Sequence, residues 1–152
     1  MAISKKQQQN AFKKALDLIK DGNVSCVVIR GGEIIHTADG RGVSPLLKLY
    51  GGEPDKLNGS FVVDKIIGKA AAMLLVLGGV QKAYGEIMSV FAKEYLTERK
   101  ITVEYGVCVD MISDRVGNGI CPIEQSVMDE DDPEKGLVKI LDTLKKLANR
   151  AM

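Results

Sequence analysis

The stretch 61-FVVDKIIGKAAAMLLVLGGV-80 decides the fold. Phe61-Val62-Val63 has the aromatic and β-branched composition of a strand, and Gly78-Gly79 is a typical helix stop. Between them the spacing predicts a helix from Asp64 to about Leu77. Apart from its first turn and a half, this helix is apolar on every side, so we expect it to lie buried between layers.

The segments before this stretch predict a helix and then a β-hairpin. The hairpin turn is Gly31-Gly32, which implies an antiparallel pair of strands. Ser44 is expected as the N-cap of a further short helix, with Pro45 at its first helical position. The expected elements are a one-faced helix over about 5–21, strands over 25–30 and 33–37, and a short helix from 44 toward 50.

The segments after it alternate between strand and helix patterns, which implies parallel crossovers. They are a strand over about 82–88, a helix over 90–99, a strand over 101–108, a short helix beginning at Cys121-Pro122 and a last helix opened by residues 131–134. We therefore expect one three-layer α/β domain over residues 1–152, with helices on both faces of a mixed sheet and residues 1–4 as a flexible tail.

The composition excludes several classes of protein. The chain has 152 residues, with 21 Lys+Arg against 20 Asp+Glu, so a general nucleic-acid binder is not expected. Three cysteines without a C-x-x-C pair, and a single histidine, argue against a disulfide scaffold and a zinc finger. We expect a cytoplasmic protein without a membrane segment, because no targeting sequence or apolar run of about 20 residues is present.

Lys65, Gly68 and Lys69 are residues that folding alone does not explain. On the expected helix the two lysines are neighbours in the opening turns, where the dipole disfavours positive charge by roughly 0.3–1 kcal/mol each. Gly68 inside the helix costs up to about 1 kcal/mol more than alanine. Together with Asp64 and the backbone N–H groups of the first turn, they predict a binding site for a small anion.

Other interpretations of these residues stay open. The lysines can extend from the rim into water while Gly68 only eases packing, or a desolvated lysine such as Lys69 can act as a base or a Schiff-base amine. A Walker A loop is excluded, because Ala70 stands where Ser or Thr is required and Val63 where the first glycine should be.

Three further positions are candidates. Cys121 is expected at the N-cap of the helix opened by Pro122, where a thiolate nucleophile is stabilised; the alternative is an ordinary buried thiol. Arg41, with Gly42 beside it, can bind a phosphate or carboxylate from a pliable loop, or can simply be solvated. His36, on a hairpin strand, is interpreted as structural because no partner pattern accompanies it.

The order of elements, with Gly40-Arg41-Gly42, residues 64–72 and Cys121-Pro122-Ile123-Glu124, resembles a small prokaryotic family of unknown function in the cytidine-deaminase-like superfamily. The resemblance implies a deaminase-like fold whose ligand pocket opens at the N-terminus of the Asp64 helix. Zinc deaminases carry H-x-E and P-C-x-x-C at two helix starts. Neither motif is present here, so no metal and no cofactor are expected.

The leading hypothesis is therefore a metal-free protein that binds a small anionic ligand, nucleotide-like by analogy with deaminase-fold relatives. The expected ligand-binding residues are Arg41, Gly42, Asp64, Lys65, Gly68 and Lys69. If the protein is an enzyme, which the sequence leaves open, Lys69 and Cys121 are the expected catalytic residues. The alternative hypothesis is a structural or regulatory oligomer with a vestigial site. Under either hypothesis we expect a homo-oligomer.

Overall fold

Five strands form one mixed sheet in the computed structural model, which describes residues 4–113, 117 and 119–150. The strand order across the sheet is β2-β1-β3-β4-β5. Strand β1 pairs antiparallel with β2 and β3, whereas β3, β4 and β5 are parallel to one another. The strands are β1 (Cys26–Arg30), β2 (Glu33–Ala38), β3 (Phe61–Ile67), β4 (Lys82–Ser89) and β5 (Thr102–Val109).

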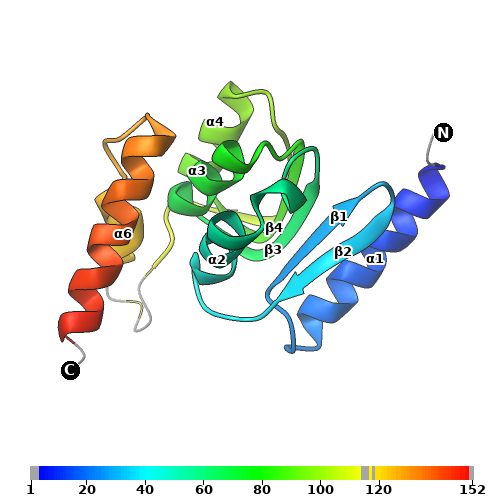
Figure 1. Cartoon of the computed structure of the whole chain (residues 1–152), viewed down its shortest axis with the longest axis horizontal. Helices are drawn as coiled ribbons and strands as arrows, with labels where there is room; N and C mark the ends of the chain where they lie inside the picture. Colours follow the sequence, from blue (N-terminus) through cyan, green and yellow to red (C-terminus); the bar gives the residue numbers. More distant parts are fainter. Residues whose placement is uncertain (1–3, 114–116, 118, 151–152) are drawn as a thin grey trace.

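Helices cover both faces of the sheet (Figure 1). Helix α1 (Lys5–Lys20) packs on one face, against β1, β2 and β3. The other helices gather around α3 on the opposite face. They are α2 (Ser44–Gly52), α3 (Lys69–Gly78), α4 (Val90–Glu98), α5 (Pro122–Ser126) and α6 (Pro133–Arg150), with a 3-10 turn, η1, at Pro54–Lys56. The predicted three-layer α/β fold with a mixed sheet is confirmed.

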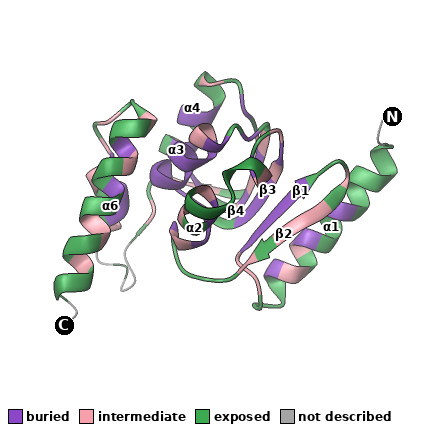
Figure 2. Cartoon of the chain, in the orientation of Figure 1, coloured by how far each residue is buried: buried purple, intermediate pink, exposed green. Residues whose placement is uncertain are grey.

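Each face of the sheet has its own apolar core. Under α1, Ala15 and Ile19 pack with Val27 and Val63. The larger core lies on the other face, and α3 is its centre, since every residue from Ala70 to Leu75 is buried (Figure 2). Alanines at the start of α3 let the helix approach the sheet closely, and its leucines fill the space toward the neighbouring helices. The prediction that this helix is buried between layers is confirmed.

The predicted start of that helix is wrong by five residues. Asp64 to Ile67 continue strand β3, with Asp64 opposite Cys26 on β1 and Gly85 on β4. Helix α3 begins only at Lys69, with Gly68 as its N-cap in an extended conformation. The β-branched pair Ile66-Ile67 favours a strand, and pairing on both sides fixes it. The C-terminal stop is as predicted, because Gly79 adopts the left-handed conformation at φ 78°.

Most other element boundaries agree with the sequence to within two residues. One cap differs: α2 already includes Ser44, and its N-cap is Val43, which gives no side-chain hydrogen bond. The predicted turn-rich stretch 110–119 falls partly outside the described residues. Among residues 4–113, 117 and 119–150, no helix combines the length and the apolar composition needed to cross a bilayer.

Candidate functional site at the start of helix α3

The N-terminus of α3 is hydrogen-bonded to a carboxylate of the chain itself. Glu124, on α5, accepts hydrogen bonds from the backbone N–H of Lys69 at 2.6 Å and of Ala70 at 3.0 Å. These are two of the N–H groups that the first turn of a helix leaves without an intrahelical partner. We call this arrangement the Glu124 cap. Backbone N–H groups on which the predicted anion site depended therefore have an acceptor within the chain.

The Glu124 cap is buried. The glutamate is 6% exposed, and burial raises the pKa of its carboxyl above the ordinary value. The N–H groups of Ala70 and Lys69, and then the Lys69 ammonium, act in the opposite direction. Gly68 makes the approach possible, because a Cβ atom at this position would overlap with the Glu124 carboxyl group. The glycine that the sequence singled out therefore accommodates Glu124.

The Lys69 ammonium points to the chain that follows α5. Its Nζ donates a hydrogen bond to the carbonyl oxygen of Met128 at 2.8 Å, and it lies 5.8 Å from the centre of the Tyr95 ring. The Asp131 carboxylate is 4.0 Å away and almost fully exposed, so this ion pair contributes little. Lys69 itself is 7% exposed. Its backbone and its side chain thus both hold the segment 124–131 against α3.

Lys65 and Asp64 do not belong to the same site as Lys69. The prediction that the two lysines are neighbours on one helix face is wrong, because Lys65 is an exposed residue of strand β3. Asp64 is buried in the sheet, opposite Cys26. Burial raises the pKa of Asp64 to about 7, and the N–H groups of Lys65 and Ile66 and the Cys26 thiol oppose this only partly. Burial and the nearby Asp64 raise the pKa of Cys26 well above its ordinary value.

The remaining predicted residues lie on other elements. Cys121 is the N-cap of α5 as predicted, half-buried, and its N–H donates to the carbonyl of Ile112 at 2.9 Å. Arg41 and Gly42 lie in the exposed connection between β2 and α2, where Gly42 has φ 56°. His36 is a half-buried residue of edge strand β2.

The side chains at the start of α3 do not fit a zinc ion. Glu124 already accepts two N–H bonds, and the charge of the Lys69 ammonium lowers the pKa of its carboxyl. In the described part of the chain, no group of three His, Cys, Asp or Glu side chains is placed to hold a metal. A zinc site needs at least three such ligands together.

Two hollows lie elsewhere, next to helix α1. One, of about 490 Å³, lies between α1 and the start of β2; the other, of about 570 Å³, extends across the starts of β3, β4 and β5. The larger one is lined by Phe61 and Lys82, and the Lys82 ammonium lies 4.7 Å above the Phe61 ring. Both hollows are therefore at the end of β3 opposite to Gly68. No local motif in the sequence marks Lys82 or Phe61 as a candidate site residue.

Glu124 and Met128 are the partners of Lys69 that the sequence analysis missed. Glu124 lies 55 residues from Lys69 and 54 residues from Ala70, whose N–H groups donate to it. The sequence offers one signal, a glutamate three residues after Cys121, but no local pattern connects it to Gly68.

Comparison with known proteins gives a family but no activity. Residues 14–144 match the family described as TM1506, a domain of unknown function (DUF1893). The solved structure of a DUF1893 family protein, TM1506 from Thermotoga maritima, is similar: it is 26% identical with a TM-score of 0.78, over 95% of this chain and 92% of that one. No curated protein matches the chain. The chain belongs to the DUF1893 family.

Proposed function

We propose that this protein is a structural or regulatory assembly protein, in which a cytidine-deaminase-like architecture no longer presents a ligand site at the start of α3. The observation that carries the proposal is the Glu124 cap. A small anion needs the free N–H groups of the helix start, and here a buried carboxylate accepts the N–H groups of Lys69 and Ala70.

The other groups that an anion site would need also make contacts within the chain or lie elsewhere. The Lys69 ammonium, the expected counter-charge, donates to the Met128 carbonyl. The space in front of Gly68 holds the Glu124 carboxyl group. Lys65, the second expected cation, is on the exposed part of a strand. An anion would have to displace Glu124, leaving a buried carboxylate without its donors, which costs more than the roughly 1–3 kcal/mol of a neutral buried group.

Chemical rescue of a truncated cap tests the proposal. In Glu124→Ala, the N–H groups of Lys69 and Ala70 lose their acceptor and a carboxylate-sized space opens beside Gly68. Acetate at about ten times its Kd should then stabilise this variant by about 1.4 kcal/mol. That is a rise in Tm of roughly 3–6 °C for a domain of this size. Sodium chloride at the same ionic strength is the control for screening.

The wild-type protein is the decisive comparison. Neither acetate, phosphate nor a nucleoside monophosphate should raise its Tm beyond the chloride control through binding at the start of α3, because the cap is occupied. Glu124→Gln keeps the shape of the side chain and serves if the alanine variant does not fold; it should also show no acetate rescue. A phosphate-dependent or nucleotide-dependent rise in the wild-type Tm that Lys69→Met abolishes would overturn the proposal.

The larger of the two hollows beside α1, at the starts of β3, β4 and β5, favours a second function, the binding of a small anion that carries an aromatic ring. Its volume, about 570 Å³, is within the range of ligand pockets. It offers an ammonium group, Lys82, and an aromatic side chain, Phe61, although Lys82 also pairs with Glu104 at 3.1 Å. A nucleoside monophosphate whose stabilising effect is lost in Lys82→Gln and kept in Lys69→Met would support this function.

A further inference from the structure

Among the residues that the structure describes, strand β5 has a paired strand on one side only. It pairs with β4 on one side and is the last strand in the order β2-β1-β3-β4-β5. Five of its eight residues are exposed, with Val107 at 57%. An edge strand presents unpaired backbone N–H and C=O groups, which form a template for another strand.

This edge lacks the features by which proteins usually block strand addition. Proline and lysine are absent from β5, and its one charged residue, Glu104, is engaged with Lys82 at 3.1 Å. The opposite edge, β2, differs, because four of its six residues are half-buried. Of the two edge strands, β5 is thus the one with the larger share of exposed residues.

An apolar row leads to this edge. Ile66, Ile87 and Val107 are partners in the register of β3, β4 and β5, and each is more than a third exposed. Helix α1 packs against β1, β2 and β3, which lie toward the β2 edge of the sheet and away from β5. Tyr105, also exposed, adds a large side chain beside Val107. A strand placed next to β5 would therefore meet apolar side chains as well as backbone groups.

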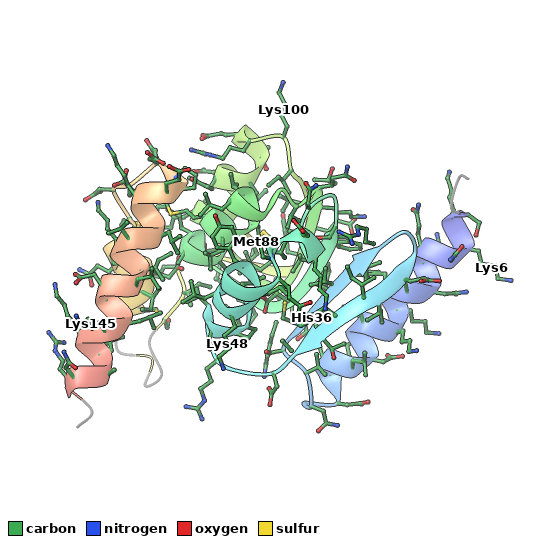
Figure 3. All side chains as sticks on the ribbon, in the orientation of Figure 1. Lys6, His36, Lys48, Met88, Lys100 and Lys145 are labelled. Atoms are coloured by element: carbon green, nitrogen blue, oxygen red, sulfur yellow. The ribbon has the colours of Figure 1, made fainter. Side chains whose placement is uncertain are left out.

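The two ends of β5 carry opposite charges. Lys100 is exposed just before the strand and Asp110 is exposed just after it. Figure 3 shows Lys100 pointing away from the body of the molecule. If two copies of β5 pair antiparallel, Lys100 of each copy lies near Asp110 of the other. Parallel pairing would instead place like charges side by side, which is unfavourable.

We propose that β5 binds β5 of a second copy of this chain, antiparallel and around a two-fold axis near the middle of the strand. The two five-stranded sheets become one continuous sheet. Such a pair is isologous, so the same surface is used on both copies and the assembly closes as a dimer. The proposal rests on the proposed function as an assembly protein, and it identifies the surface that assembles.

Sedimentation velocity or light scattering over a series of about 1–100 µM chain, which begins near a Kd of about 1 µM, tests the proposal, because a tenfold weaker dimer dissociates within this range. The wild-type protein should approach twice the chain mass of 16.5 kDa. Val107→Lys replaces an apolar side chain of the joined sheet by an ammonium group, which loses hydration when the two strands pair, and should weaken the dimer by about tenfold or more. Two control variants, Thr37→Lys on edge strand β2 and Val138→Lys on helix α6, add the same charge at exposed positions and should leave the dimer unchanged.

Charge reversal tests the antiparallel direction. Lys100→Glu or Asp110→Lys should each weaken the dimer, because each creates two like-charge contacts, and the double variant should restore it. A monomeric wild-type protein, or a dimer that Val107→Lys leaves intact, would overturn the proposal. Neither result bears on the Glu124 cap, whose test is the effect of anions on Tm. A dimer that survives Val107→Lys would also leave the assembly function standing, through another surface.

Discussion

Gly68 and Glu124 are packed so closely that a side chain on residue 68 would overlap with the Glu124 carboxyl group. Gly68 allows Glu124 to act as a helix cap, because the carboxyl group reaches the first N–H groups of α3 only past a residue without a Cβ atom. The start of the most buried helix is therefore closed by a contact between α3 and α5.

This contact predicts the effect of Gly68→Ala. Its backbone, at φ −102°, is open to any residue, so the penalty comes from overlap alone. We expect a loss of about 1–3 kcal/mol in the free energy of unfolding, measured by urea denaturation. Gly51→Ala is the matched control, because its Cβ would meet no atom within 4 Å and the change should be neutral or stabilising. A loss in Gly68→Ala that persists undiminished in a Glu124→Ala background would contradict the explanation.

The two lysines that look alike in the sequence should behave differently when each is changed to methionine. Lys69→Met removes the partly buried hydrogen bond to the Met128 carbonyl and should cost about 1.5–3 kcal/mol of stability. Lys65→Met changes an exposed side chain on β3 and should stay within about 0.5 kcal/mol. Chemical denaturation of both variants measures the difference, and equal losses would show that Lys69 has no special role.

Asp64 should make the protein less stable as the pH rises from about 4 to 7. Its pKa is about 7 in the folded protein against an ordinary 3.8, so between these values the folded state binds more protons than the unfolded state. The loss reaches up to about 4 kcal/mol and levels off above pH 7.

Asp64→Asn removes this titration. Its stability should vary less with pH between 4 and 7 than that of the wild-type protein, as shown by urea midpoints across this range. Glu124 has a raised pKa too, so Glu124→Gln is measured in parallel to separate the two contributions. Identical pH profiles for wild type and Asp64→Asn would show that Asp64 is not protonated in the folded protein.

Gly136→Ala should destabilise the contact between α3 and α6. In a helix interior this change ordinarily stabilises by up to about 1 kcal/mol. Here a Cβ atom at residue 136 would overlap with the sulfur of Met73, which is fully buried. We expect a net loss of about 1–2 kcal/mol, and a gain instead when Met73 is shortened to alanine. A double-mutant cycle on urea midpoints gives the coupling between the two positions.

The architecture could be predicted from the sequence because its signals are local. The Gly31-Gly32 turn fixes the hairpin, the alternation after Gly79 fixes the parallel strands, and Pro122 fixes the start of α5. Each depends on a few adjacent residues whose conformational preference agrees with the final fold.

The candidate site could not be predicted to the same degree because it depends on pairing between distant segments. The spacing of Lys65 and Lys69 suits a helix, but Asp64 pairs with Cys26 and Gly85, and these contacts place the segment in the sheet. The acceptor for the helix start comes from residue 124, which no local pattern connects to Gly68. Tertiary contacts therefore determine both where helix α3 begins and where the charged residues near its start lie.

The Glu124 cap also changes how slowly two amide protons should exchange with solvent deuterium. In most helices the first-turn amides exchange early, since nothing inside the helix holds them. The amides of Lys69 and Ala70 are held by a residue on α5, so they exchange only when α5 separates from α3. Their exchange rates thus report directly how often α5 separates from α3.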